Sequence, residues 1–330
     1  MSMHLTLAEA FGRGRNANLD ALRLLLAACV IVSHAWPLTL GPGTAEPLLD
    51  RTGRSLGGWA VVLFFFLSGL LITASSQRRS AVAFWRARIR RIFPGLGVAV
   101  LVTLLLAQVS GATADLREST VWAMRAITLV SIEHRLSGAF VDNPYPLVLN
   151  GPLWSLFYEI AAYVLCAVIA LATPRRRLAW IGALLTATTL GLLWNGPLPH
   201  RVDTALPLFL AFGFGMAAHD LRASLALLPS LGALLVLSVP LLPAPLAIPA
   251  VCYGILSLAL VAPQVRLSAD YSYGLYIYGW PVAQSVLWLA PGLSPASLAV
   301  LSLAATMPFA IASWHLVEHP ATRRRAQVAA

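Results

Sequence analysis

The sequence predicts an all-α integral membrane protein, a polytopic bundle of about ten transmembrane helices with both termini in the cytoplasm. Of its 330 residues, 58% are hydrophobic and only 11% are charged, and the mean hydropathy is +0.77. A soluble protein of this length needs far more charge to cover its surface. Apolar windows of roughly 20 residues, the length that crosses a bilayer, recur along the chain, and arginines gather between alternate windows.

The net charge is +10, and every basic residue apart from histidine is arginine. Nucleic-acid binding could account for such a charge. The arginines, however, lie in short segments between apolar windows, as the positive-inside rule requires. We therefore expect the lipid bilayer as a partner, no nucleic acid, and a multi-pass location in a bacterial inner (plasma) membrane.

The apolar windows divide the chain into a cytoplasmic tail (1–17), one transmembrane domain (18–320) and a second cytoplasmic tail (321–330). Cys29, Cys166 and Cys252 have no paired or metal-ligand spacing, so we interpret them as small packing residues. The expected spans cover approximately 18–38, 56–75, 93–109, 150–172, 178–194, 204–218, 225–242, 246–263, 271–290 and 296–316.

The segments between the spans also carry signals. Gln77–Pro94 holds six arginines, which is typical of a cytoplasmic loop. Residues 110–150 are the longest hydrophilic stretch and are expected outside the cytoplasm, with Val121–Ile132 apolar enough to lie on the membrane or dip into it. Ser68 and Gly69 should allow close contact between helices, because small residues let backbones approach in lipid.

The first span carries ionisable side chains at positions where they are costly unless they face protein or a water-filled cavity. Asp20 and Arg23 lie at its entrance and His34 near its far end. Arg23 and His34 share nearly one helix face, about 16 Å apart along the axis, because eleven residues at about 100° each complete three turns. The spacing predicts a cation near one membrane surface and a titratable base deeper in.

Six motifs in fixed order resemble the membrane-bound acyltransferase type 3 family, which includes bacterial O-acetyltransferases of exopolysaccharide and lipopolysaccharide O-antigen. None of these motifs is specific alone, but their order and spacing cover almost the whole chain. The motifs are Leu19-Asp-Ala-Leu-Arg23 followed by His34, Phe65-Phe-Leu-Ser-Gly69, the Arg88–Pro94 segment, Trp154-Ser-Leu-Phe-Tyr-Glu159, Ser272-Tyr-Gly-Leu-Tyr-Ile-Tyr-Gly-Trp-Pro281 and Val317-Glu-His-Pro320.

The resemblance implies that residues 18–320 form an acyltransferase domain. The domain would move an acyl group from acyl-CoA to a carbohydrate hydroxyl, with acetyl-CoA as donor substrate and no permanently bound cofactor or metal. Two departures matter: Gly279 stands where many relatives have a histidine, and His319 where many have another basic residue. By family position, the catalytic residues would be His34 and Glu159, the acyl-CoA ligands Arg23, Arg88 and Arg91, and the supporting residues Asp20, Ser155 and Tyr273.

Each assignment has a plainer alternative. His34 has the neutral-range pKa of a general base, yet a helix histidine can also be satisfied by a backbone carbonyl. Arg23 can bind phosphate through a bidentate fork, or simply pair with Asp20. Glu159 lies on the face of Ser155 at i,i+4 and can orient a histidine or bind a sugar hydroxyl, or pair with an arginine. Tyr273 can line a sugar path or anchor its helix at the interface.

His315-Leu-Val-Glu-His319 fits the H-x-x-E-H pattern of some zinc peptidases. We do not expect zinc, because Pro320 should end the helix at once and Arg323–Arg325 bring positive charge to the site. Glu318 is interpreted as a structural group at the end of the last helix.

The sequence therefore predicts a membrane O-acyltransferase that moves an acetyl or short acyl group from acyl-CoA to a sugar hydroxyl of a cell-surface glycan or glycolipid. His34 would act as general base, or carry the acyl group covalently. The alternatives are a transporter or flippase of a lipid-linked or polar sugar, and a non-catalytic membrane partner. A transporter is expected to show an internal repeat and more polar groups at the midplane.

Overall fold

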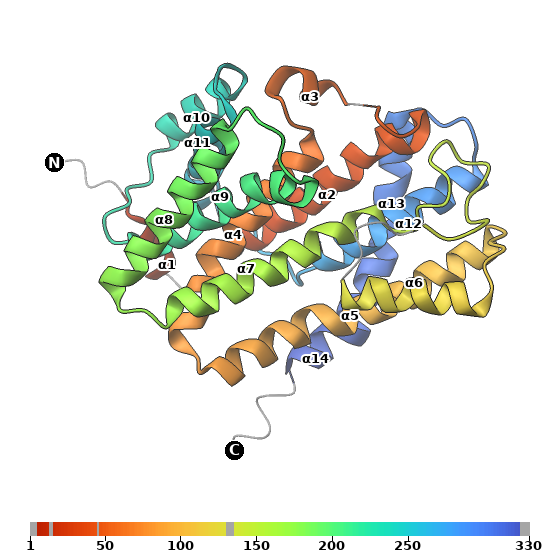
Figure 1. The fold of residues 1–330 in the computed structure, drawn as a ribbon, viewed down its shortest axis with the longest axis horizontal. Coiled ribbons are helices and arrows are strands. Elements are labelled where there is room, and N and C mark those ends of the chain that lie inside the picture. The colour runs from red at the N-terminus through yellow and green to blue at the C-terminus, as the bar shows by residue number, and fades with distance from the viewer. Residues whose placement is uncertain (1–4, 13–15, 45, 130–134, 324–330) are drawn as a thin grey trace.

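The structure is a computed structural model that describes residues 5–12, 16–44, 46–129 and 135–323. Within these ranges the chain is helical and forms no β-strand, only two isolated bridges. Figure 1 shows the order of the helices along the chain. They are α1 (Leu7–Gly12), α2 (Ala17–Leu40), α3 (Pro47–Thr52), α4 (Leu56–Arg78), α5 (Ala81–Val109), α6 (Leu116–Thr128), η1 (Gly151–Leu153), α7 (Trp154–Ala170), α8 (Pro174–Leu193), α9 (His200–Asp220), α10 (Pro229–Ser238), η2 (Val239–Leu241), α11 (Ala244–Val261), α12 (Ser272–Leu289), α13 (Pro295–Ser313), η3 (Trp314–Glu318) and α14 (His319–Arg323).

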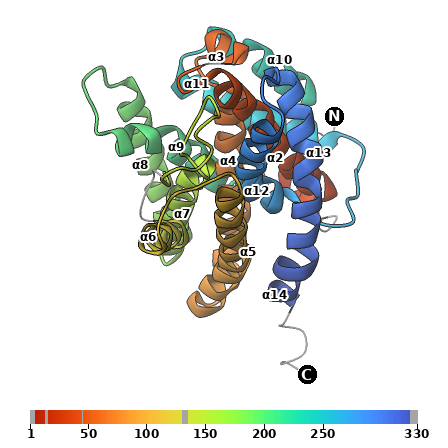
Figure 2. The same cartoon turned by 90° about the vertical axis from the view of Figure 1, so that its right-hand side faces the viewer.

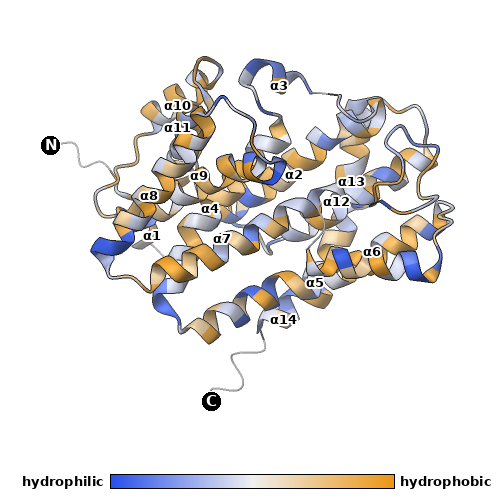
Figure 3. Cartoon of the chain, viewed as in Figure 1, coloured by the Kyte–Doolittle hydropathy of each residue, from blue (hydrophilic) through white to orange (hydrophobic). Residues whose placement is uncertain are grey.

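Seven helical segments in the described part of the chain are long and apolar enough to cross a membrane. Leucine and valine side chains on their outer surfaces remain exposed, as lipid contact requires. Hydrophilic residues gather at helix ends and connecting segments (Figure 3). The predicted all-α, multi-pass membrane protein is confirmed, whereas the count of ten spans and the cytoplasmic termini stay predictions. The seven segments are α2, α4, α5, η1–α7, α9, α11 and the continuous run Pro295–Arg323.

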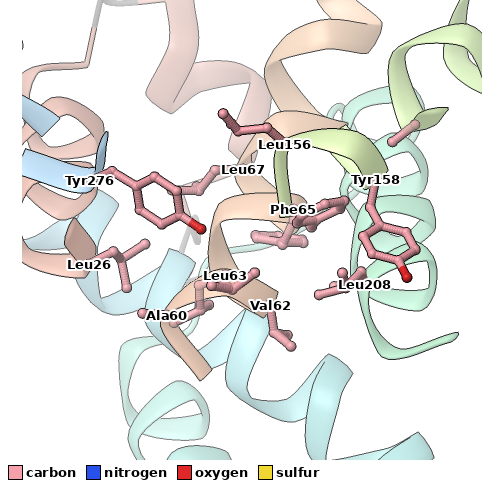
Figure 4. Packing of buried hydrophobic residues seen from close by; sticks show 14 of the residues in the cluster. Leu26, Ala60, Val62, Leu63, Phe65, Leu67, Leu156, Tyr158, Leu208 and Tyr276 are labelled. Atoms are coloured by element: carbon pink, nitrogen blue, oxygen red, sulfur yellow. The ribbon is translucent and has the colours of Figure 1, made fainter. Parts of the chain in front are cut away.

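Helix α4 lies at the centre of the bundle and packs against α2, α7 and α9. Figure 4 shows its buried side chains, among them Phe65, between residues of the neighbouring helices. A Cβ on Gly69 would lie 2.1 Å from the carbonyl oxygen of Phe212, and one on Gly215 equally close to that of Phe66. The α4–α9 contact therefore depends on glycine in both helices, which confirms the predicted role of Gly69.

Helix α12 lies against α2, α5 and α13 (Figure 2). A Cβ on Gly274 would come within 2.7 Å of the Ala310 Cα in α13, and one on Gly279 within 2.6 Å of Ile31 Cγ1 in α2. Gly279, where many relatives carry a histidine, is thus a point of close approach between α12 and the first span.

The expectation that residues 77–94 form a loop is wrong for residues 81–94, which are helical, whereas their cytoplasmic location stays a prediction. Helix α5 starts at Ala81, where the Ser80 hydroxyl accepts a hydrogen bond from the Ala83 N–H (3.4 Å). Alanine and arginine both favour helix, so the arginines continue the span toward its N-terminus. They therefore occupy fixed angular positions on a rigid element.

The expectation that Pro320 ends the last helix is also wrong. A π-helical turn, Trp314–Glu318, comes before it, with the His319 N–H bonded to the Trp314 carbonyl. Pro320 then falls in the first turn of α14, where its missing N–H is not needed. The chain stays helical to Arg323, while the rest of the expected arginine run and tail lies outside the described residues.

Two short helices lie outside the expected spans, one in the N-terminal tail and one in the hydrophilic stretch 110–150. The described part of the N-terminal tail forms α1, whose Leu7 N–H donates to the Leu225 carbonyl (2.8 Å). Helix α6 packs against α5 and buries Trp122, while Leu116 and Met124 remain exposed. Membrane contact of this segment stays a prediction, and its end at Ile132 lies outside the described residues.

Candidate active site

A cavity of about 690 Å³ lies among α2, α4, α5, α7 and the start of α12. We call it the arginine cavity, because six arginines and three carboxylates among the described residues line it: Arg23, Arg79, Arg86, Arg88, Arg90, Arg91, Asp20, Glu159 and Asp270. Its volume is within the range of small-molecule sites. The structure brings together here every predicted site residue except His34, namely Asp20, Arg23, Arg88, Arg91, Ser155, Glu159 and Tyr273.

Two of the predicted arginines have unused hydrogen-bonding capacity. The Nε atoms of Arg23 and Arg88 are buried without a hydrogen-bond partner among the described residues. The Arg88 guanidinium lies over the rings of Phe84 (6.0 Å) and Tyr163 (5.9 Å), contacts that hold it by cation–π attraction. Both arginines therefore retain donors for an anionic ligand.

Arg91 is engaged differently. Its guanidinium forms ion pairs with Asp270 (2.8 Å) and Glu318 (3.1 Å) and lies 5.5 Å from the centre of the Tyr273 ring. The Ser313 hydroxyl donates to the other oxygen of Glu318 (2.9 Å). Arg91 thereby joins α5 to the segment before α12 and to η3. If Arg91 also binds acyl-CoA, as predicted, it does so while paired with two carboxylates.

Asp270 contributes to the cavity wall just before α12. Burial alone would raise the pKa of this carboxyl, but Arg23, Arg91 and the hydrogen bonds from Ser272 lower the pKa to about 2. The Ser272 hydroxyl donates to Asp270 Oδ1 at 2.5 Å. Asp270 is therefore ionised at neutral pH and offsets part of the positive charge of the cavity.

A second polar group runs along the α7 side of the arginine cavity. Tyr163 donates a hydrogen bond to Glu159 one turn earlier. Ser155 shares a hydrogen bond with the Tyr276 hydroxyl (2.5 Å), which also donates to the Pro152 carbonyl (3.1 Å). The expected shared face of Ser155 and Glu159 is confirmed, since both line this cavity.

His34 lies in a second cavity of about 280 Å³ at the other end of α2, which we call the histidine cavity. The His34 ring meets the Trp280 ring edge-on, with 5.0 Å between ring centres. Trp280 is itself fixed by a hydrogen bond from its Nε1 to the Val148 carbonyl (3.0 Å). Its described lining is Val30, Ser33, His34, Pro37, Thr44, Glu46, Leu49, Ser55, Gly57, Gly58, Val61, Pro152, Trp154 and Tyr276.

Glu46 is the carboxylate of the histidine cavity, and the sequence interpretation did not find it. It is only 5% exposed. Its Oε1 accepts hydrogen bonds from the Ser33 hydroxyl (3.1 Å) and the Leu56 N–H. Burial raises the pKa of Glu46, and the hydrogen bonds from the Ser33 hydroxyl and the Gly57 backbone oppose part of that rise.

Val61 and Tyr276 line both cavities, so the two cavities meet at this pair. Arg23 and His34 accordingly lie on one helix, but each in its own cavity. Glu159 lines the arginine cavity, and the carboxylate that lines the histidine cavity is Glu46. The catalytic assignment of His34 and Glu159 stays a prediction, and direct assistance of His34 by Glu159 finds no contact among the described residues.

Two of the missed residues, Glu46 and Asp270, had weak signals in the sequence. Glu46 directly precedes Pro47 and reads as an ordinary residue before a helix start. Asp270 stands two residues before Ser272 at the start of a span, the pattern of a local turn. Only the tertiary structure shows that Glu46 shares a cavity with His34 and that Asp270 pairs with Arg91.

The H-x-x-E-H residues are arranged for packing. Glu318 faces Arg91 and Ser313. The His319 ring stacks on Trp314 (5.3 Å), and His315 Nε2 lies 3.3 Å from the Tyr271 hydroxyl. In the described part of the chain, no group of three metal-ligating side chains forms.

The comparisons with known proteins decide the family. Residues 16–317 match the sequence model of the family described as an acyltransferase domain. The chain belongs to this acyltransferase family. The predicted enzyme class is confirmed, and the transporter and non-catalytic alternatives are set aside. No solved structure matches the chain.

Three relatives support the same assignment. The O-acetyl transferase of Shigella phage Sf6 is 30% identical over 91% of this chain and 94% of its own. Nodulation protein 10 of Rhizobium leguminosarum bv. viciae is 28% identical over 96% of both chains. Acyltransferase MdmB of Streptomyces mycarofaciens is 32% identical over 51% of this chain and 42% of its own.

Proposed function

We propose that this membrane acyltransferase moves an acetyl or short acyl group from acyl-CoA to a sugar hydroxyl of a cell-surface glycan or glycolipid, in a bacterial inner membrane. The observation that carries the proposal is the pair of cavities that meet at Val61 and Tyr276, one rich in arginine and one containing His34. O-acetyl transfer is taken from the name of the phage relative, and the sugar acceptor from the motif resemblance.

The donor would bind in the arginine cavity. CoA carries phosphates, which arginine forks bind through charge-assisted hydrogen bonds. Arg23 and Arg88 keep donors for this purpose. The acyl end would then point along α2 toward Tyr276, and the thioester would come within reach of His34.

His34 would act as the general base for transfer of the acyl group to the acceptor. His34 takes the proton of the acceptor hydroxyl while the hydroxyl oxygen attacks the thioester carbonyl carbon. The carbon–sulfur bond breaks, and the CoA thiolate leaves and takes up the proton. The products are the O-acyl glycan and CoA thiol, so atoms and charge balance. A covalent acyl-histidine intermediate would use the same groups in two steps.

Purified protein, radiolabelled acetyl-CoA and the envelope glycan fraction of a strain lacking this gene provide the test. We expect wild-type protein to label the glycan and His34→Ala to lose at least about 100-fold of that rate, the usual contribution of a general base. His200→Ala, at an exposed histidine, should keep the wild-type rate. No labelling by wild-type protein, or full activity of His34→Ala at an equal amount of folded protein, would contradict the proposal.

A further inference from the structure

The histidine cavity holds a buried carboxylate for which the proposed chemistry has no use. Glu46 is 5% exposed and lies in the α2–α4 connection, directly before α3. No arginine lines this cavity in the described part of the chain, and no ion pair forms with Glu46 there. A buried charge without a cation is costly unless hydrogen-bond donors surround it.

Three protein donors reach this carboxylate. The Ser33 hydroxyl and the Leu56 N–H donate to Oε1, and the Gly57 backbone adds a further hydrogen bond. An ionised carboxylate has about four acceptor sites on its two oxygens. One acceptor site is therefore available to a hydrogen-bond donor that enters the cavity.

The other residues that line the histidine cavity restrict which kind of ligand could donate this hydrogen bond. Ser33 and His34 are consecutive in α2, so the fixed oxygen of Glu46 lies beside the backbone that carries the candidate base. The cavity of about 280 Å³ is at the small end of ligand sites. Trp154 and Tyr276 form part of its wall, and aromatic surfaces of this kind suit the apolar faces of a sugar ring. A carboxylate beside aromatic side chains can accept hydrogen bonds from the hydroxyl groups of an uncharged sugar.

We infer that Glu46 binds the acceptor sugar, accepting a hydrogen bond at its remaining acceptor site from a hydroxyl next to the one that is acylated. This inference rests on the proposed function and extends it by naming a residue for acceptor specificity. Glu46 orients the acceptor toward His34 and takes no proton itself. Its loss therefore weakens acceptor binding, while donor binding in the arginine cavity is unaffected.

Glu46→Gln is the decisive variant. Its amide oxygen still accepts from Ser33 and Leu56, which preserves the local structure, while the amide nitrogen replaces Oε2 with a donor. With the unacylated envelope glycan fraction of a strain lacking this gene as acceptor, we expect KM for glycan to rise at least tenfold. KM for acetyl-CoA should change less than twofold. Asp50→Asn, an exposed carboxylate in α3, should leave both constants unchanged.

Each other result overturns the inference. Wild-type constants for Glu46→Gln would show that the Glu46 carboxylate does not bind the acceptor. A fall in kcat with unchanged KM for glycan would make Glu46 part of the proton-transfer machinery. Failure of Glu46→Gln to accumulate, while Ser33→Ala accumulates normally, would show that the charge serves folding. Inactive wild-type protein contradicts the proposed function itself, so the two failures are distinguishable.

Discussion

The two cavities differ in charge as much as in size. The arginine cavity combines six arginines with three carboxylates in about 690 Å³. The histidine cavity, of about 280 Å³, has one carboxylate and one histidine but no arginine among its described residues. Charge that is expensive inside a membrane is concentrated at one end of α2. The other end keeps a base among aromatic and small residues.

This difference indicates a division of labour along one helix. Arg23 and His34 belong to the same span, yet Tyr276 and Val61 separate their surroundings. The arginines at one end of α2 attract a polyanionic acyl donor. His34 lies at the other end of α2, outside the arginine cavity. Variants that break this separation should therefore affect one cavity and leave the other intact.

The largest expected effect is on the wall of the arginine cavity. Arg91→Ala leaves Asp270 and Glu318 without their partner, and removal of one member of a buried ion pair costs about 3 kcal/mol or more. We expect a clearly lower melting temperature in detergent, followed by tryptophan fluorescence. Arg86→Ala, at an exposed arginine, should melt like wild type. Equal melting of both variants would show that Arg91 does not hold the wall together.

The pH dependence of that wall gives a second test. The Asp270 pKa of about 2 is below its usual value of 3.8, so the folded state binds this proton more weakly than the unfolded state. The stabilisation, at most about 2 kcal/mol, is present above pH 4 and lost as the pH falls toward 2. Wild type should melt higher than Asp270→Asn at pH 7, and the gap should narrow by pH 3. A constant gap would mean that Arg91 and Arg23 do not lower this pKa.

Binding of acetyl-CoA should depend on arginines that keep unused hydrogen-bond donors. Arg23→Ala removes a guanidinium with an unpartnered Nε, and loss of a charged hydrogen bond costs about 1.5 kcal/mol or more. KM for acetyl-CoA should rise about tenfold while kcat changes little. Arg51→Ala, at an exposed arginine in α3, should have no effect. An unchanged KM at low ionic strength would remove the phosphate role of Arg23.

The smallest expected effect concerns the junction. Tyr276→Ala widens the junction between the cavities, and the ratio of kcat/KM for butyryl-CoA to that for acetyl-CoA should rise about threefold, an energy of under 1 kcal/mol. Tyr276→Phe retains the ring and should keep the wild-type ratio. An unchanged ratio in Tyr276→Ala would show that the acyl group does not pass this residue.

The long apolar helices followed directly from the sequence, because lipid forces every spanning segment to be apolar and helical. The start of α5 did not. Its arginines were interpreted as a loop on charge alone, although Ser80 and the alanine-rich sequence favour a helix. Pro320 was likewise expected to end a helix, because the π-helical turn before it depends on tertiary contacts such as Arg91–Glu318.

The candidate site was likewise predicted only in part. The grouping of Arg23 with Arg88 and Arg91 was expected, because the resemblance assigns all three to acyl-CoA binding. Glu159 was assigned to catalysis with His34, yet it lies in the arginine cavity. Glu46 could not, because its meaning depends on how a Gly/Pro-rich connection folds back over α2. No periodicity extends through such a connection. The split of Arg23 and His34 between two cavities depends equally on Tyr276, which arrives from the other end of the chain.

The most direct test of the two separate cavity roles is to measure glycan acetylation in vesicles with acetyl-CoA supplied on one side only. Thr322 of α14 lines the arginine cavity, so a C-terminal tag reports which way each protein faces in a vesicle. Acetyl-CoA, which its charge keeps from crossing lipid, is supplied on one side only, and the deletion-strain glycolipid fraction is present in both leaflets. We predict glycan acetylation when acetyl-CoA is on the side of the arginine cavity and none when it is on the other side. Equal acetylation from either side would contradict donor entry through the arginine cavity.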